Sequence, residues 1–317
     1  MISVRKRFLE EVRQALLPTA IFLAVLSSHF ATAQDGKPPL ILDADTANEI
    51  DDMYAIVRML NQDKYQVLAL SSAQWIHYRG EPDSVGASQR INERLIELLD
   101  KTSLPTPKGA AEPMGKPWGG SDPKDSPAAR AIIRAARAAS PERKLIVMCL
   151  GASTNLASAI AMEPTIAKNI EARLLGFQYD WSTGVWNKSE FNIRRDLNAA
   201  DYLLNCKDLE LHIMPISVAR QLTFSRDPTF KKHQKLGALG NYLTQKWKAR
   251  FADSETWIMW DLALVQALIR PHQATFAKVV TPPENVQRDV WMYKSIDAKA
   301  MKADYWDVVL TSDQATK

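Results

Sequence analysis

Four aspartates lie close together near the start of the chain, in the segment 40–52, which reads LILDADTANEIDD. Asp43 and Asp45 end an apolar stretch that predicts a strand, and residues two apart on a strand point to the same side. Asp51 and Asp52 precede a helical pattern, so we expect them at a helix N-terminus, whose dipole favours negative charge. Carboxylates this close repel one another unless a cation is present. The segment therefore predicts a hard divalent cation with oxygen ligands, calcium before magnesium.

Other interpretations of this segment compete. Asp51 could simply cap the helix, although one aspartate would suffice for that. A calcium-binding EF-hand loop does not fit, because its fifth, sixth and twelfth positions would be Ala47, Asn48 and Tyr54. A haloacid-dehalogenase-like phosphatase also begins with a strand and Asp-x-Asp. It expects Thr or Val where Ala47 stands, and it leaves the doubled Asp51-Asp52 unexplained.

Three further segments follow that combine polar and apolar residues: 150–155 (LGASTN), 189–193 (SEFNI) and 260–261 (WD). Thr154 and Asn155 could form a helix cap after a strand. Glu190 and Asn192 could be ordinary surface residues. Asp261 is harder to dismiss, because a carboxylate among apolar neighbours is costly unless it has a partner.

Together, these landmarks resemble the inosine-uridine-preferring nucleoside hydrolase family, especially its branch with Asp-x-Asp, five residues, then Asp-Asp. They occur in the family's order and cover almost the whole chain after its first 33 residues. The resemblance implies a calcium ion held by Asp45, Asp52, the main-chain carbonyl of Leu150 and Asp261. It also implies that Asp45 is the general base that activates a metal-positioned water.

The resemblance further implies which residues bind substrate. Asp51, Glu190 and Asn192 would hold sugar hydroxyls, with Asn48 a weaker candidate from the same loop, and Asp43 would support the site from behind. The reaction would be hydrolysis of the N-ribosyl bond of a nucleoside or related riboside. Such a reaction passes through a cation-like sugar, so water is needed on one face and help for the departing base on the other.

The chain departs from the family pattern where the base would bind. Trp260 stands where the family usually has His before Asp261, and Gly184 replaces an Asn that precedes the Glu-Phe-Asn segment. We therefore expect Trp260 to stack on the departing base, with His77 as a nearby candidate proton donor. Five tryptophans in predicted loops or site edges suggest an aromatic-lined pocket, although we expect some of them to be core residues instead: Trp75, Trp118, Trp181, Trp186 and Trp260.

The apolar pattern predicts the scaffold. Strand-like stretches at 39–42, 65–71, 145–150, 174–177 and 211–214 alternate with helical patterns. This alternation predicts an α/β fold with a mostly parallel central sheet and helices on both faces. We expect one nucleoside-hydrolase-like, Rossmann-like domain over residues 34–317. Segment 104–126 is predicted to be a loop at the rim of the sheet, 229–270 to be largely helical, and the tail from Phe276 to be irregular with a short strand or two.

The N-terminus predicts export. Basic residues, an apolar run at 20–26 and Ala-Thr-Ala at 31–33 are typical of a signal peptide over residues 1–33. The apolar run is far shorter than the roughly 20 residues of a spanning helix, so no stable membrane anchor is expected after cleavage. The protein would be periplasmic or secreted. Cys149 and Cys206 are interpreted as small core residues rather than a disulfide.

Charge and composition limit the partners. The net charge of the whole chain is +4. The leader holds four basic and two acidic residues, so the chain without it has a net charge of about +2. This balance does not favour nucleic acid. The expected partner is a small nucleoside or riboside, and the sequence leaves a homo-oligomer open. A non-catalytic exported calcium- and sugar-binding protein is the main alternative function, favoured by the missing His before Asp261 and opposed by the presence of Asp45.

Overall fold

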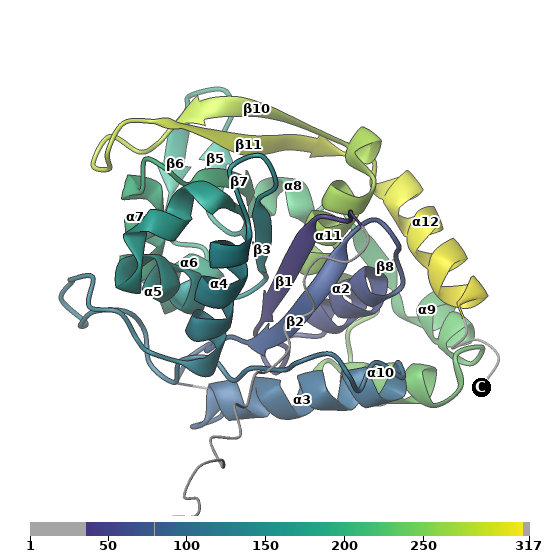
Figure 1. The fold of residues 1–317 in the computed structure, drawn as a ribbon. Coiled ribbons are helices and arrows are strands. Elements are labelled where there is room, and N and C mark those ends of the chain that lie inside the picture. Colours follow the sequence, from purple (N-terminus) through teal and green to yellow (C-terminus); the bar gives the residue numbers. More distant parts are fainter. Residues whose placement is uncertain (1–35, 79, 313–317) are drawn as a thin grey trace, which may run out of the picture. The chain divides into compact units, whose positions relative to one another are not determined.

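Seven strands form the central sheet of the computed structural model, which describes residues 36–78 and 80–312 (Figure 1). The strand order is β10-β11-β7-β4-β3-β1-β2, and all neighbours are parallel except the antiparallel pair β10–β11. The strands are β1 (Pro39–Ala44), β2 (Gln66–Ser72), β3 (Leu145–Cys149), β4 (Ile170–Leu175), β7 (Glu210–Met214), β10 (Ala274–Val280) and β11 (Asp289–Ile296). The predicted leader lies outside the described residues, and residues 36–78 and 80–312 belong to one compact unit.

The central strands are apolar on both faces because helices cover both. Every residue of β1 and of β3 is buried. Leu40 and Leu42 belong to one core cluster, whereas Ile41 between them belongs to the other. Successive side chains of a strand point to opposite faces, so these two clusters are the two faces of the sheet.

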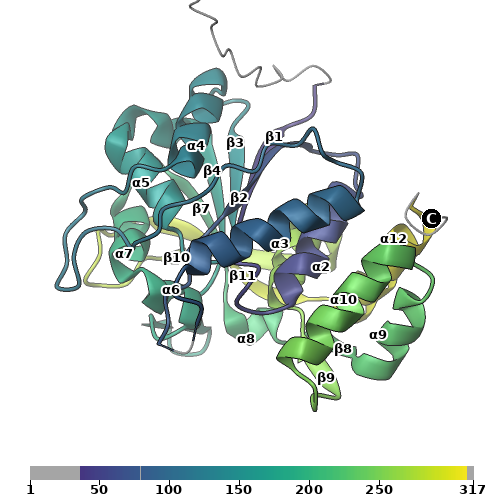
Figure 2. The ribbon, with the colours of Figure 1, turned by 90° about the horizontal axis from the view of Figure 1, so that it is seen from below.

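The helices divide between the two faces (Figures 1 and 2). One face packs against α4 (Pro127–Ala138), α5 (Thr154–Met162) and α7 (Leu197–Asn205). The other packs against α2 (Asp51–Leu60), α3 (Ser84–Leu98), α10 (Gly237–Arg250), α11 (Trp260–Ile269) and α12 (Ala298–Thr311). The predicted α/β fold, with a mostly parallel sheet covered on both faces, is confirmed.

Shorter elements complete the described chain. The hairpins are β5 (Gln178–Asp180) with β6 (Val185–Asn187), and β8 (Thr223–Ser225) with β9 (Thr256–Ile258). The short helices are α6 (Phe191–Arg195), α8 (Ile216–Ala219), α9 (Arg226–His233) and the 3₁₀ turns η1 (Pro164–Asn169) and η2 (Pro271–Gln273).

Two sequence-based element predictions need correction. The strand expected at 174–177 runs instead over Ile170–Leu175. Its start was missed because half-buried Glu171 and Arg173 alternate with the buried residues and interrupt the apolar pattern. The tail contains two strands, as expected, but also α12, which was not predicted. The buried face of α12 includes Tyr305 and Trp306, residue types that are equally at home in strands.

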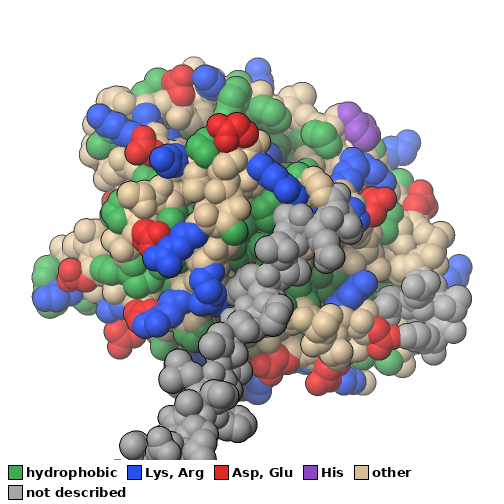
Figure 3. Space-filling view, in the orientation of Figure 1, with side chains coloured by type: hydrophobic (Ala, Val, Ile, Leu, Met, Phe, Trp, Pro, Cys, Tyr) green, Lys and Arg blue, Asp and Glu red, His purple; other side chains and the backbone are tan. Residues whose placement is uncertain are grey.

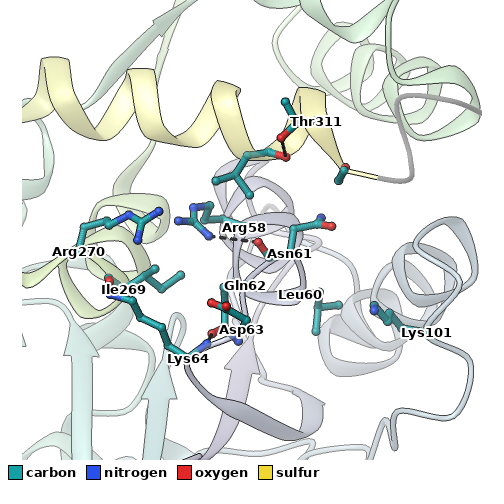
Figure 4. A pocket seen from close by; sticks show the side chains of 12 residues that line it. Arg58, Leu60, Asn61, Gln62, Asp63, Lys64, Lys101, Ile269, Arg270 and Thr311 are labelled. Carbon is teal, nitrogen blue, oxygen red and sulfur yellow. Dashed lines mark hydrogen bonds between the residues drawn. The ribbon is translucent and has the colours of Figure 1, made fainter.

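A buried ion network fixes three helices at the end of α2 that is far from the aspartates. Asp304 of α12 accepts from Nη2 of Arg58 at 2.7 Å and from Nε of Arg270 at 2.6 Å. Figure 4 shows the guanidinium groups of Arg58 and Arg270 next to each other, with Lys64 reaching the carbonyl of Ile269 at 2.8 Å. These cations lie at the C-terminal ends of α2 and α11, where the helix dipoles favour positive charge. The network therefore holds α2, α11 and α12 together.

The surface is mixed in charge and no described helix is long and apolar enough to cross a membrane. On the face shown in Figure 3, Lys and Arg side chains are interspersed with Asp and Glu. This arrangement agrees with the nearly neutral charge expected for the chain without its leader.

Candidate functional site

A cavity of about 170 Å³ lies at the carboxyl ends of β1 and β3. β1 lies between β2 on one side and β3 on the other, so the direction of strand addition reverses here. Open α/β sheets bind ligands at such a switch point. Apart from His77, the candidate proton donor, every residue that the sequence analysis assigned to substrate, to the metal or as general base lines the cavity: Asp45, Asn48, Asp51, Asp52, Leu150, Glu190, Asn192, Trp260 and Asp261.

Two packed helices begin at this cavity and bring three aspartates together. Asp51 and Asp52 are the first residues of α2, and Asp261 is the second residue of α11. The backbone N–H of Asp261 donates to Oδ2 of Asp51 at 3.0 Å. Oxygen atoms of these three aspartates all lie within 4.8 Å of one another. Both helix dipoles stabilise the negative charge, but they do not remove the repulsion between the carboxylates.

Asp45 faces this group from the end of β1 and is only 2% exposed. Its position depends on Gly151, because a Cβ atom at residue 151 would lie 2.7 Å from Cγ of Asp45. Such a contact is too short for ordinary packing, so a larger residue would displace the carboxylate. The glycine that follows the strand end at Leu150 is therefore explained by the close approach of Asp45.

Burial and mutual repulsion raise the pKa values of the cluster. Burial is the main cause at Asp45, Asp52 and Asp261, and the neighbouring carboxylates add to it. Burial and then Asp51 raise the pKa of Glu49 to about 8, although Arg250 opposes the rise. These carboxyl groups are therefore costly to ionise without a compensating positive charge.

The donor set fits a hard divalent cation. Asp45 Oδ2, Asp52 Oδ1 and Asp261 Oδ1 are buried without a hydrogen-bond partner. Buried carboxylate oxygens are normally hydrogen-bonded, so three such atoms in one cavity indicate ligands for an ion rather than structural groups. The three aspartates whose oxygens lie within 4.8 Å of one another include Asp51, which the resemblance assigned to the sugar, and do not include Asp45.

The loop between β1 and α2 is tied to the two helices beside it. The N–H of Asn48 donates to the carbonyl of Asp45 at 2.8 Å, and Nε of Arg250 in α10 donates to the carbonyl of Asn48 at 2.9 Å. The hydroxyl of Thr46 donates to the carbonyl of Ser88 in α3 at 3.2 Å. These bonds restrict the loop that carries the cavity's acidic residues.

The residues expected to bind sugar line the other side of the cavity. Glu190 caps α6, since Oε2 accepts from the N–H of Ile193 at 3.1 Å. Nδ2 of Asn192 donates to the carbonyl of Leu150 at 2.8 Å. Asn192 therefore also fixes the strand-end carbonyl that the resemblance assigned to calcium. A carbonyl has two lone pairs, so this bond leaves room for a second partner.

Asp43 lies behind the cavity, as expected for a supporting residue. Its Oδ1 accepts from Ser71 Oγ at 2.7 Å and from Asn155 Nδ2 at 2.9 Å. Burial raises its pKa to about 6, while these two donors oppose the rise. Asp43 thus connects the end of β1 to β2 and α5 rather than facing a ligand.

The predicted capping role of Thr154 and Asn155 is wrong. Ser153 is the residue before α5, and the hydroxyl of Thr154 donates to Asp196 at 2.6 Å. Oδ1 of Asn155 accepts from the N–H of Ala110 at 2.9 Å and from Ser126 Oγ at 3.1 Å. Both side chains are used in long-range bonds, which fix the segment 104–126 against the sheet.

The expected aromatic lining is largely wrong. Only Trp260 of the five tryptophans lines the cavity. Trp118 is 83% exposed, while Trp181 and Trp186 pack on Tyr179 at centroid distances of 5.0 and 5.4 Å. The hairpin β5–β6 turns its aromatic residues onto one another, a contact that local sequence does not reveal. Trp75 is buried and lines a neighbouring hollow instead.

Other residues near the cavity were not assigned or are placed differently than expected. Glu49, Phe191, Leu175 and Ile216 line it without having been predicted. Glu49 lies within the acidic segment 40–52 and Phe191 within the segment 189–193. Their positions in these motifs could have predicted that they line the cavity. His77 does not line the cavity. Its ring centroid lies 5.8 Å from that of Phe191, which does line it. The segment 104–126 contributes no lining residue to the cavity.

Replacing Asn155 tests whether the support behind the cavity is energetically important. Asn155→Ala removes hydrogen bonds to Asp43, Ala110 and Ser126 and leaves buried groups unsatisfied. We expect the free energy of unfolding to fall by about 3 kcal/mol in urea denaturation. Asn169→Ala is the control, because Asn169 makes one bond to the carbonyl of Ala136, and its loss should cost about 1 kcal/mol. Equal losses would contradict the supporting role.

Known proteins share both the sequence pattern and the fold. The family model described as inosine-uridine preferring nucleoside hydrolase matches residues 40–314. The probable uridine nucleosidase 2 of Arabidopsis thaliana is 26% identical over 229 residues, which cover 65% of this chain and 68% of that protein. A plant nucleoside hydrolase structure superposes with a TM-score of 0.68 at 17% identity, covering 87% of this chain and 99% of that one.

A second solved structure has the same fold. The purine-preferring ribonucleoside hydrolase from Gardnerella vaginalis superposes with a TM-score of 0.65 at 18% identity, covering 87% of this chain and 99% of that one. The family match spans nearly all described residues, including each of the four landmarks. The chain therefore belongs to the inosine-uridine preferring nucleoside hydrolase family, an enzyme family, as its acidic cluster and the three later segments predicted.

Proposed function

We propose that this protein is an exported, calcium-dependent enzyme that hydrolyses the N-ribosyl bond of a nucleoside or related riboside. One observation carries the proposal. The unpartnered oxygens of Asp45, Asp52 and Asp261 share a cavity with Glu190 and Asn192, which can hold a sugar. Family membership supports the reaction class, and the signal-like sequence over residues 1–33 supports export.

The calcium ligands would be Asp45, Asp52, the carbonyl of Leu150 and Asp261. Bound calcium would supply positive charge that orients a water and the ribose diol. Asp51 lies close enough to add its charge, and its Oδ2 is already used by the N–H of Asp261. Its side chain also lines the cavity, where it can contact a sugar hydroxyl.

The protein's own groups perform the remaining steps. Asp45 accepts the proton of the water whose oxygen attacks C1′ of the ribose. The bond between C1′ and the base nitrogen breaks, and its electron pair leaves with the base. Asp51, Glu190 and Asn192 hold the sugar hydroxyls, so the attack occurs within a fixed geometry. The carboxylates of the cavity also favour the positive charge that develops on the sugar.

Calcium should stabilise the folded protein, and more so at high pH. Because the cluster's pKa values are raised, the calcium-free folded state holds protons that the unfolded state releases. Its stability should therefore fall as pH rises from about 4 towards 8. Calcium replaces those protons, so the increase in melting temperature on adding calcium should be larger at pH 8 than at pH 5.

Asp261→Asn should remove most of this calcium effect, while exposed Asp307→Asn in α12 should keep it. Differential scanning calorimetry with calcium and with a chelator measures both. A melting temperature that does not respond to calcium at either pH would contradict the metal site.

Asp45→Asn should abolish turnover and leave the protein folded. An amide of the same shape cannot accept the water's proton, so kcat should fall by about a thousandfold. Release of reducing sugar from a panel of purine and pyrimidine nucleosides is the measurement, with Asp307→Asn as the control. If the native protein binds calcium and ribose but hydrolyses none of the panel, the non-catalytic alternative is supported. Phosphatase activity with magnesium would support the haloacid-dehalogenase-like alternative.

Trp260 should matter most for poor leaving groups. It lines the cavity where the family usually has His, and an indole cannot supply a catalytic proton. We expect Trp260→Ala to lower kcat on a nucleoside much more than on a nitrophenyl riboside, which departs as a stable phenolate. Asp45→Asn should lower both equally. Equal losses on the two substrates in Trp260→Ala would show that Trp260 only shapes the cavity.

A further inference from the structure

A second hollow, of about 780 Å³, lies between α3 and α10 and adjoins the cavity. Figures 1 and 2 both show these helices side by side. Thr46, Ala47 and Ile50, from the loop that carries the acidic cluster, line this hollow. Glu49 of the same loop lines both the hollow and the cavity. We call it the α3–α10 groove.

The groove carries more positive than negative charge. Arg90 and Arg94 line it from α3, Lys246 and Arg250 from α10, and Glu49 and Glu81 are its two acidic residues. Arg94 pairs with Glu97 at 2.8 Å, and Arg250 donates to the carbonyl of Asn48. Among the described residues, Arg90 and Lys246 form no ion pair with a carboxylate within 4.0 Å.

The two unpaired cations are near each other, and Arg90 is exposed to solvent. Lys246 is half-buried, with Nζ 5.3 Å from the ring centroid of Tyr242. Burial and the positive charge of Arg90 lower the pKa of Lys246. An anion between these groups would remove their repulsion and use the fork of the arginine.

The groove adjoins the cavity at Glu49, and the proposed function places the departing base against Trp260 in the same cavity. Trp260, the proposed stacking partner of the base, lines the cavity together with Glu49. A substituent on the stacked base that points past Glu49 therefore enters the groove. A base with an anionic substituent would place its charge among the four cations while its ribose remains beside Asp45.

We propose that the α3–α10 groove binds an anionic substituent of the leaving group, and that the substrate class is ribosides of carboxylated nitrogen heterocycles. This inference rests on the proposed function. It also agrees with the absence of a proton donor at Trp260. A heterocycle bound to ribose through a quaternary ring nitrogen leaves as a neutral ring without protonation.

Nicotinic acid riboside and nicotinamide riboside test the inference directly. The heterocycle of each riboside departs without a proton on its ring nitrogen. The two heterocycles differ only in their substituent, which is a carboxylate in the acid and a neutral amide in the other. We expect kcat/KM to favour the acid by about tenfold, because a charge-assisted contact to Arg90 and Lys246 is formed only by the carboxylate. The preference should decrease with added salt.

Arg90→Gln/Lys246→Gln should abolish this preference. Lys168→Gln/Lys299→Gln removes the same charge from exposed positions in η1 and α12 and should keep it. Melting temperatures show whether each double variant is folded. Calorimetric binding of free nicotinate against nicotinamide provides a second measurement that does not depend on turnover.

The outcomes separate this inference from the proposed function. Hydrolysis of both ribosides without a preference for the acid, or an equal preference in the Arg90/Lys246 variant, overturns the inference and leaves the function standing. If neither of these ribosides nor any nucleoside of the purine and pyrimidine panel is hydrolysed, but nicotinate binds the native protein and not that variant, the function fails and the groove stands. Nicotinate that binds no better than nicotinamide, with no riboside hydrolysed, overturns both.

Discussion

The repulsion among buried carboxylates at the start of α2 and α11 is the constraint on which the site depends. Both helices direct their N-terminal dipoles at the same point, which favours negative charge but cannot balance several carboxylates. Contacts elsewhere in the fold offset the electrostatic repulsion between these carboxylates. At the far end of α2, Arg58 and Arg270 share Asp304, so the helices stay together although their first residues repel. Such a cluster favours a bound cation over any purely structural role.

The sheet supplies the other half of the site, where two strand ends approach each other closely. Asp45 at the end of β1 lies against Gly151 after β3, where no side chain fits. Behind it, Asp43 and Asn155 connect β1, β2 and α5 through buried hydrogen bonds. The switch point between β1 and β3 is thus not an open crevice but a rigid support, and the position of the Asp45 carboxylate follows from backbone geometry.

Local patterns predicted the parts of the protein whose causes are local. The apolar strands and the position of Asp51 and Asp52 at a helix start follow from burial and helix dipoles, whereas the resemblance to the family was needed to assign Asp45 and Asp261 to the same site. Thr154 and Asn155 were misjudged because their partners, Asp196 and Asp43, lie far along the chain. Trp181 and Trp186 were misjudged because their contacts with Tyr179 form only when their own hairpin folds. The α3–α10 groove was unpredictable for the same reason, since its cations come from helices more than a hundred residues apart.

The two sides of the site differ in how they are built, and this bears on specificity. On the ribose side, Glu190, Asn192 and the Leu150 carbonyl are bonded to one another or to helix ends, so a change in one disturbs the others. On the leaving-group side, Trp260 offers a flat surface, and beyond Glu49 the walls are side chains of α3 and α10 with few fixed partners. Among the groove's cations, Arg250 is bonded to the described loop that carries the acidic cluster, whereas Arg90 and Lys246 make no hydrogen bond or ion pair to it. Under the proposed function, the ribosyl chemistry is constrained by the fold, whereas the identity of the departing group depends on surface residues that can change independently.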